Sequence, residues 1–475
     1  MNPKDLVNIN RLVIAAPQGR CGKTTITLGL LRAFKRRGLR VQPFKKGPDY
    51  IDPSWLSAAA GIACRNLDSY LMEPEQICKS VSMAAPYDLS IIEGAMGLFD
   101  GLDLAGSSST AEIAKITKTA VILVIDATRM TRSAAAIVLG CQHFDPQIQI
   151  CGVILNKVAR PRHEKMLREA IEHFCKIPVL GAIPKDSELS IPDRHLGLIT
   201  NIETDNSDRL LDYLAEIINK HVDLDQVYAL ATQTSQLPQS WYTKPLNQTR
   251  HKDSQPARIG VMRDKVFSFY YPENISALVN LGGQIVEINS LTDPCLPPDL
   301  DALYIGGGFP EVFAADLESN IELRLSIKKA VESSLPIYAE CGGLMYLGRT
   351  LKVEGRFFAM TGALPFDVVM EPKPQGHGYT LLESLPGNLW YTTGIKVKGH
   401  EFHNSRIINL DPRVKFAYKV ERGHGIDGVH DGIIYNGVLA SYNHLHALGT
   451  PQWAVKLVEL AKSHKSCKLS MSIGV

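Results

Sequence analysis

A cysteine at a turn between an apolar strand and a helix is the first residue with a clear chemical capacity. Cys341 lies in PIYAECGGLMYLG (336–348), where Gly342 and Gly343 follow it directly. Small residues permit the strained turn that lifts a nucleophile above a sheet. A helix N-terminus favours the thiolate by lowering the pKa of a thiol. We therefore predict that Cys341 is a nucleophile, against the alternative of an inert buried cysteine.

Backbone N–H groups beside this cysteine would complete a site for acyl transfer. The segment IGGGFPE (305–311) ends another strand and offers consecutive N–H groups. Donors in such a row suit an oxyanion hole. We predict an oxyanion hole formed by Gly307, Gly308 and Gly342.

A general base is expected among the histidines late in the chain. Two segments, ASYNHLHALG and GHEFHNS, contain His400, His403, His444 and His446. The histidines of HEFH are three apart, unlike those of an HExxH zinc signature, so we assign no metal there. The first segment follows the apolar run IIYNGVL and is the better source of the base.

A phosphate-binding loop is predicted where the strand at 12–16 runs through PQGRCGKTT into an apolar helix. N–H groups at such a helix N-terminus wrap a phosphate, the lysine reaches the outer phosphates and the threonine hydroxyl holds Mg²⁺. The complete pattern has glycine where this chain has Pro17. We predict ATP binding by five residues of this loop: Gly19, Gly22, Lys23, Thr24 and Thr25.

Carboxylates follow two strands that should end beside this loop. The segment KKGPDYIDP carries Asp49 and Asp52, Glu93 ends the strand LSIIEG, and Asp100 follows in a glycine-bracketed loop. Acids at the carboxyl ends of strands are well placed to bind Mg²⁺ or to position a phosphate acceptor. We predict Mg²⁺ ligation by Thr24, Asp49 and Glu93, and catalytic roles for Asp49, Glu93 and Asp100. Asp52 can equally close a turn.

Asn156 and Lys157 end a further strand in the sequence LNK. Such a pair often contacts the purine ring in phosphate-loop folds, and the alternative is a capping asparagine. We predict that both residues bind the nucleotide.

Composition excludes several classes of protein. A formal charge of +2 without a basic stripe gives no electrostatic case for nucleic acid. The N-terminal apolar run is too short for a signal peptide, and no stretch approaches the ~18 apolar residues of a membrane helix. The nine cysteines form no CxxC pair, which indicates reduced thiols in a cytoplasm. We expect a cytoplasmic protein that binds small molecules and has no nucleic-acid or membrane partner. A homodimer is compatible with this expectation.

Two series of strands, each alternating with helices, position these residues. Such alternation predicts an α/β fold in which a doubly wound parallel sheet is followed by a second α/β domain. The strand runs lie at 12–16, 41–45, 89–92, 120–126, 150–155, 178–183, 258–262, 284–288, 302–308 and 336–341. The polar stretch between the two series lacks an apolar period and is typical of a linker. The predicted parts are a phosphate-loop domain at 1–229, a linker at 230–256 and the second domain at 257–475.

Ten motifs follow one another along nearly the whole chain: APQGRCGKTT, FKKGPDYIDP, NLDSYLM, EGAMGLFDG, LNK, RHLGL, IGGGFPE, AECGGLMYL, GHEFHNS and ASYNHLH. This succession resembles the cobyrinic acid a,c-diamide synthase family. The resemblance implies an ATP-binding domain similar to dethiobiotin synthetase, then a class I glutamine amidotransferase domain with a flavodoxin-like fold. It implies a ligase of cobalamin biosynthesis that uses Mg²⁺ and ATP. Such an enzyme amidates the a- and c-acetates of cobyrinic acid through acyl phosphates, with nitrogen from glutamine or ammonia.

The resemblance also implies roles for single residues. Cys341 matches the glutaminase nucleophile and His444 the histidine that activates it. Class I amidotransferases usually carry glutamate two residues after that histidine, where this chain has His446, so a Cys–His dyad is implied. Acids near Mg-ATP and the substrate carboxylate are matched by Asp49, Glu93 and Asp100, and positions near the macrocycle by Tyr50 and Ile51.

Alternatives remain open at this point. The same chemistry could act on hydrogenobyrinic acid or a nickel sirohydrochlorin, and the departures from the family pattern at Arg20 and Asn443 do not decide. A cobyric acid synthase would usually lack GPDYIDP. A partitioning-type switch ATPase would carry a signature lysine where this chain has Gln18, and would leave the Cys341 turn unexplained.

Overall fold

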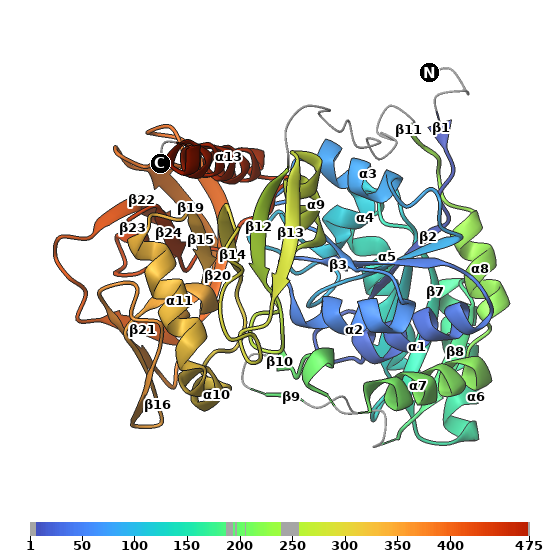
Figure 1. Cartoon of the computed structure of the whole chain (residues 1–475). Helices are drawn as coiled ribbons and strands as arrows, with labels where there is room; N and C mark the ends of the chain where they lie inside the picture. The colour runs from blue at the N-terminus through green and yellow to red at the C-terminus, as the bar shows by residue number, and fades with distance from the viewer. Residues whose placement is uncertain (1–5, 187–192, 195–196, 205, 239–255, 474–475) are drawn as a thin grey trace. The chain divides into compact units, whose positions relative to one another are not determined.

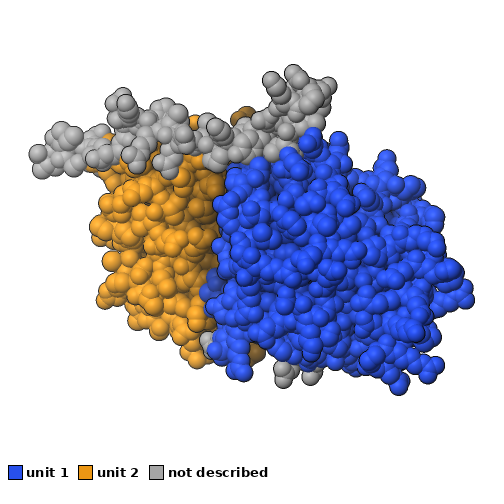
Figure 2. All heavy atoms as spheres, turned by 90° about the vertical axis from the view of Figure 1, so that its right-hand side faces the viewer, with its two compact units in different colours: residues 1–247 blue, residues 248–475 orange. Residues whose placement is uncertain are grey.

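The chain forms two compact units, residues 1–247 and 248–475, coloured blue and orange in Figure 2. The computed structural model describes residues 6–186, 193–194, 197–204, 206–238 and 256–473. Among the described helices, none combines the length and the apolar character needed to cross a membrane.

The first unit contains a sheet of seven parallel strands in the order β4-β3-β5-β2-β6-β7-β8. Strands β2, β3, β7 and β8 of this sheet are labelled in Figure 1. Because neighbouring strands in this order run parallel, they are joined by crossover connections rather than by hairpins. The predicted doubly wound parallel sheet is confirmed. The strands are β2 (Arg11–Ala15), β3 (Val41–Lys46), β4 (Arg65–Leu67), β5 (Leu89–Glu93), β6 (Val121–Asp126), β7 (Ile150–Val158) and β8 (Val179–Pro184).

Helices of this unit bury apolar stripes of helical spacing. In the first of them, Ile26, Leu30 and Phe34 recur every four residues and are at most 1% exposed. They share a core cluster with Leu214 and Ile218. The helices are α1 (Lys23–Arg36), α2 (Ile51–Ala60), α3 (Pro74–Ser82), α4 (Thr110–Ile116), α5 (Ser133–Phe144), α6 (Pro161–Cys175), α7 (Ser207–His221) and α8 (Leu224–Thr232), with a 3₁₀ turn, η3 (Asn201–Glu203). Two short strand pairs are β1 (Leu6–Val7) with β11 (Leu237–Pro238), and β9 (Asp193–Arg194) with β10 (Gly197–Leu198).

The predicted linker at 230–256 falls partly on described residues. Its first residues belong to α8 and residues 237–238 form β11, whereas 239–255 lie outside the described residues. The exact domain limits therefore stay a prediction.

The second unit is built on a mixed sheet of nine strands, in the order β13-β12-β14-β15-β24-β23-β22-β19-β20. The first five strands are parallel and the remaining pairings are antiparallel. The strands are β12 (Ala257–Met262), β13 (Gly283–Ile288), β14 (Ala302–Ile305), β15 (Ile337–Glu340), β19 (Gly376–Ser384), β20 (Lys396–His403), β22 (Lys415–Arg422), β23 (His430–Tyr435) and β24 (Val438–Ser441).

A smaller sheet and five helices complete this unit. The sheet has the order β17-β16-β18-β21. Its strands are β16 (Thr350–Val353), β17 (Arg356–Ala359), β18 (Asp367–Met370) and β21 (Ser405–Ile408). The helices are α9 (Pro272–Asn280), α10 (Ala314–Ser319), α11 (Ile321–Glu332), α12 (Gly342–Leu347) and α13 (Pro451–Ile473).

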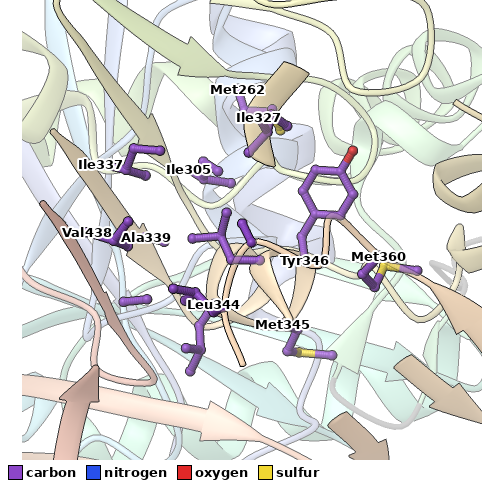
Figure 3. Packing of buried hydrophobic residues seen from close by; sticks show 14 of the residues in the cluster. Met262, Ile305, Ile327, Ile337, Ala339, Leu344, Met345, Tyr346, Met360 and Val438 are labelled. Carbon is purple, nitrogen blue, oxygen red and sulfur yellow. The ribbon is translucent and has the colours of Figure 1, made fainter. Parts of the chain in front are cut away.

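The short helix α12 is fixed by an apolar core at the end of β15. Leu344 and Met345 from α12 pack with Ile305 of β14 and with Ile337 and Ala339 of β15 (Figure 3). All five side chains are at most 3% exposed. Close packing of this kind resists movement, so these side chains hold the turn between β15 and α12 in place.

Candidate active sites

The turn that carries Cys341 is strained. Cys341 has φ 45° and ψ −98°, a conformation that L residues rarely adopt and that costs about 1–3 kcal/mol. Its N–H donates to the carbonyl of Ser441 at 2.8 Å, which ties the turn to the end of β24. A strained residue between a strand and a helix matches the geometry of a nucleophile elbow.

The environment of the Cys341 thiol opposes ionisation. Burial raises the pKa of the thiol well above its ordinary value, the carboxylate of Glu311 raises it further, and a hydrogen bond from Gly342 N–H only partly offsets this. The expectation that the helix N-terminus lowers this pKa is therefore wrong, because desolvation outweighs the short helix. A neutral thiol needs a base to become a nucleophile.

His444 is held beside the glycine segment predicted to form the oxyanion hole. The side chain of His444 is 3% exposed, and its ring stacks on His400 with the centroids 5.0 Å apart. Backbone N–H groups of His444 and His400 donate to each other's carbonyls at 2.8 and 3.2 Å. A Cβ at Gly307 would lie 2.5 Å from the His444 Cε1 atom, so only glycine leaves room for this ring.

The glycine segment and the cysteine turn approach each other closely. A Cβ on Gly342 would lie 3.0 Å from the Gly308 nitrogen. The N–H groups of Gly306 and Phe309 are already bonded, to Tyr270 Oη at 2.7 Å and to a carbonyl at 2.9 Å. The predicted oxyanion donors Gly307, Gly308 and Gly342 thus lie close together, and their role stays a prediction.

A carboxylate that the sequence reasoning missed lies against His444. Glu340 Oε2 is 3.4 Å from His444 Nδ1, and Glu340 is fully buried. His446, at the position of the usual glutamate, faces elsewhere: its Nε2 is 3.7 Å from Glu273, and its Nδ1 accepts from the N–H of Leu448 at 3.2 Å. The sequence does place Glu340 directly before the cysteine. Its contact with His444, however, depends on the pairing of β15 with β24, which lies about 100 residues further along the chain.

The phosphate loop has the backbone that its sequence predicts. Gly22 has φ 91° and directly precedes α1. Arg20 takes a left-handed φ of 59°, so this turn of the loop is formed by a residue with a long side chain. Lys23 is 8% exposed, and its Nζ donates to the carbonyls of Met96 at 2.6 Å and Gln18 at 3.3 Å. Burial, followed by the charge of the nearby Lys45, lowers the pKa of Lys23.

Lys45, which the sequence reasoning did not single out, gathers the acids beside this loop. Its Nζ lies 2.5 Å from Asp52, 2.7 Å from Glu93 and 3.9 Å from Asp49. Glu93 Oε1 also accepts from Thr24 Oγ1 at 2.8 Å. The structure therefore brings together Thr24, Asp49 and Glu93, and it adds Lys45 and Asp52 to the site.

The Asp49 carboxyl group has an unusual environment. Burial and the neighbouring Asp52 carboxylate raise the pKa of Asp49 to about 7, although 32% of its side chain is exposed. Its Oδ1 accepts from the N–H groups of Ile51 at 2.8 Å and Asp52 at 3.2 Å, which cap the start of α2. Tyr50 is half-buried at this helix start, and Ile51 is 8% exposed.

Other predicted residues have more local contacts. Asp100 is exposed, and its Oδ2 accepts from the N–H of Gly97 at 2.7 Å, so it closes its own loop rather than contacting Lys45. Asn156 Nδ2 donates to the carbonyl of Cys21 in the phosphate loop at 2.9 Å. Lys157 pairs with Asp126 at 2.6 Å. Gly19 and Thr25 are half-buried in the loop and the first turn of α1.

Two family models match the chain, one in each unit. The CobQ/CobB/MinD/ParA nucleotide binding domain matches residues 12–199, and the CobB/CobQ-like glutamine amidotransferase domain matches residues 258–452. A protein named cobyrinate a,c-diamide synthase from Magnetococcus marinus is 46% identical over 453 residues, which cover 94% of this chain and 96% of that protein. The chain belongs to the cobyrinate a,c-diamide synthase family.

Other members of the cobyrinate a,c-diamide synthase family match over similar lengths. The protein of that name from Archaeoglobus fulgidus is 42% identical over 97% of this chain and 99% of its own length. The one from Methanosarcina acetivorans is 41% identical over 97% of each chain. The predicted family resemblance is confirmed, and so is the order of a nucleotide-binding domain followed by a glutamine amidotransferase domain.

Proposed function

We propose that the chain amidates the a- and c-acetate carboxylates of cobyrinic acid in cobalamin biosynthesis, using ATP and either glutamine or ammonia. The observation that carries this proposal is the match over nearly the whole chain to proteins named cobyrinate a,c-diamide synthase. Each half of the reaction also has a suitable group of residues. The strained Cys341 turn suits glutamine hydrolysis, and the loop at Lys23 suits phosphoryl transfer.

In the glutaminase half, the Cys341 sulfur attacks the side-chain carbonyl carbon of glutamine while His444 takes the thiol proton. The N–H groups of Gly307, Gly308 and Gly342 hold the oxyanion that forms on the carbonyl oxygen. His444 returns the proton as the C–N bond breaks and ammonia leaves. Water then hydrolyses the glutamyl thioester to glutamate. The buried, neutral thiol makes the base necessary.

In the synthetase half, an oxygen of the substrate carboxylate attacks the γ-phosphorus of ATP and ADP leaves. A carboxylate is a poor electrophile because its negative charge repels a nucleophile, and the acyl phosphate removes this charge. Ammonia attacks the acyl carbon, and phosphate leaves to give the amide. Lys23 and Lys45 offer buried positive charge for the phosphates and the acids around them. Repetition at the second acetate consumes a second ATP and a second glutamine.

The residues around Thr24 fit a bound Mg²⁺. Thr24 Oγ1 and the Glu93 carboxylate are oxygen donors in contact, and Glu93 Oε2 is buried without a hydrogen-bond partner among the described residues. Mg²⁺ prefers such oxygen ligands and takes others from the nucleotide phosphates. No group of three or more His, Cys, Asp or Glu side chains within the described part of the chain could hold a metal alone. We propose Thr24, Asp49 and Glu93 as the protein ligands, and the Mg²⁺ that they would hold would neutralise charge on the phosphates.

The remaining residues receive roles by their place around these groups. Asn156 contacts the phosphate loop and Lys157 follows it, so we assign both to the nucleotide, together with the loop residues Gly19, Gly22 and Thr25. Asp49, Glu93 and Asp100 are assigned to the phosphoryl-transfer site, and Tyr50 and Ile51 to the macrocycle. We further propose that the enzyme works in the cytoplasm on small molecules, that it has no nucleic-acid or membrane partner, and that it can form a homodimer.

Mass spectrometry of the macrocycle tests this proposal. Cobyrinic acid, hydrogenobyrinic acid and nickel sirohydrochlorin are each incubated with the protein, Mg-ATP and glutamine. The proposal predicts that the mass of cobyrinic acid falls by twice the difference between the masses of OH and NH₂. Turnover of another macrocycle with cobyrinic acid unchanged would refute cobyrinate as the substrate but keep the chemistry. No change in any macrocycle would refute the amidation itself.

A further inference from the structure

We propose that Glu340 is the positioning carboxylate of the glutaminase site, holding His444 by Nδ1 so that the opposite edge of the ring serves as the base for Cys341. This inference rests on the proposed function and extends it, because the Cys–His dyad leaves the orientation of His444 unexplained. The contact joins Glu340 Oε2 to His444 Nδ1 at 3.4 Å. The Cε1–Nε2 edge of the same ring lies against Gly307 in the predicted oxyanion segment.

Strand register brings Glu340 to the histidine. Glu340 is the last residue of β15 and pairs in parallel with Ser441, the last residue of β24. The chain that continues from β24 reaches His444 and Leu445 within four residues. The N–H of Leu445 donates to Glu340 Oε1 at 3.1 Å, so the carboxylate binds both the histidine and the backbone that follows it.

Glu340 is itself held by two tyrosine hydroxyls. Tyr338 Oη donates to Oε1 at 3.0 Å, and Tyr304 Oη donates to Oε2 at 3.1 Å. Burial raises the pKa of both tyrosines well above its usual value, so each hydroxyl keeps its proton and stays a donor. Surrounded by donors and fully buried, the carboxylate has one fixed orientation. A fixed acceptor of this kind can orient a histidine.

Other buried acids of this unit face different partners. Glu401 accepts from the N–H groups of His424 and Gly425, and Glu273 lies 3.7 Å from His446. The acid that contacts His444 therefore lies at the end of β15, directly before Cys341, and not two residues after the histidine.

The chemistry explains why such a carboxylate is useful. An acceptor on Nδ1 places the proton there, so that Nε2 is the ring nitrogen with a lone pair that can take the thiol proton. The negative charge also stabilises the imidazolium that forms while ammonia is being released. Because burial keeps the Cys341 thiol neutral at rest, the reaction depends on how well His444 accepts its proton.

The test compares Glu340→Gln with Glu273→Gln, a matched change of another buried glutamate beside another histidine. Glutamate release from glutamine and amidation with ammonium are measured with Mg-ATP and the macrocycle that the wild type amidates. We expect Glu340→Gln to lower kcat for glutamine hydrolysis by about 10²- to 10⁴-fold, as when a triad acid becomes an amide. Ammonium-dependent amidation should stay within about twofold of the wild type, because its site lies elsewhere.

The pH profile separates positioning from mere packing. Without the negative charge the imidazolium is less stable, so the acidic limb of the residual glutaminase activity should move to lower pH. Glu273→Gln should leave both the rate and this limb unchanged. An unchanged rate in Glu340→Gln, an unmoved limb, or an equal loss in both variants would overturn the proposal.

A second variant covers the case in which Glu340→Gln does not fold. Tyr304→Phe removes one donor to Oε2 and should lower glutamine hydrolysis by roughly tenfold while ammonium-dependent amidation is retained. An unaffected rate in that variant would then count against the proposal. Failure of the proposed function looks different, since the wild type itself would then leave cobyrinic acid unchanged with both glutamine and ammonium.

Discussion

Lys45 and Glu93 are paired residues of the neighbouring parallel strands β3 and β5, and their side chains form a buried ion pair of 2.7 Å. Burial alone would lower the pKa of Lys45, but the carboxylates of Asp52 and Glu93 raise it well above its usual value. Lys45 therefore stays charged and neutralises acids that could not otherwise lie together. We therefore expect the phosphate site to need this cation as well as the loop lysine.

Replacement of Lys45 by methionine should remove both stability and synthetase activity. Loss of one partner leaves buried carboxylates without compensation, which costs about 3–5 kcal/mol of unfolding free energy. Thermal unfolding and ammonium-dependent amidation are the measurements. Lys46→Met is the control, because Lys46 is the next, also buried, residue of β3 and projects to the other face. Amidation at the wild-type rate in Lys45→Met would contradict a role for this cation.

The raised pKa of Asp49 predicts a pH-dependent stability of the metal-free protein. Between the unfolded carboxyl pKa of about 3.9 and the folded pKa of about 7, the folded state binds the proton more tightly, so stability is lost as pH rises through this window. Asp49→Asn removes this loss and keeps the acceptor for Ile51 and Asp52 N–H. In EDTA, the difference between the Tm of Asp49→Asn and the Tm of the wild type should increase in favour of the variant from pH 5 to pH 8. A difference that does not vary with pH would refute the assignment.

Gly307→Ala should disable glutamine use without affecting the other half of the reaction. The new methyl would lie 2.5 Å from the His444 Cε1 atom and displace the ring. We expect glutamine hydrolysis to fall by at least about 10²-fold, since a misplaced base loses contact with its proton. Gly140→Ala, where the methyl meets no atom within 4 Å, is the control. Normal glutamine hydrolysis in Gly307→Ala would show that His444 does not need this space.

The environment of Cys341 predicts slow alkylation. Because burial raises the pKa of its thiol, Cys341 should carry little thiolate at neutral pH and react slowly with iodoacetamide. Peptide mass mapping can compare it with Cys295, an exposed cysteine in the same unit that serves as an internal control. If Cys341 reacts faster than Cys295 without glutamine, the thiol is ionised at rest and the need for a base falls away.

Local features of both sites could be predicted from the sequence. The Cys341 turn and the phosphate loop each combine a strand, small residues and a helix within about a dozen positions, and their geometry follows from neighbouring residues. Most of the parallel strands are continuous apolar runs, which predicts them from sequence, but the short strand β4 has the sequence RNL and is not predicted in this way. The antiparallel strands β19 and β22 mix buried with exposed residues, so they carry no continuous apolar run.

Contacts between segments that lie far apart in the chain cannot be predicted from the sequence alone. Glu340 meets His444 because β15 pairs with β24, and Lys45 meets Glu93 because β3 pairs with β5. Strand order, which a single sequence does not state, decides both contacts. The pKa of Cys341 was misjudged for a related reason, since the helix terminus is local whereas burial depends on the whole unit.

If separate sites release ammonia and consume it, Cys341→Ala should disable only the first of them. Amidation of cobyrinic acid is measured with glutamine and with ammonium as alternative nitrogen donors, beside a Cys295→Ala control. The predicted result is loss of amidation with glutamine and wild-type amidation with ammonium. Retained glutamine-dependent amidation, or loss with both donors in a folded variant, would contradict the account.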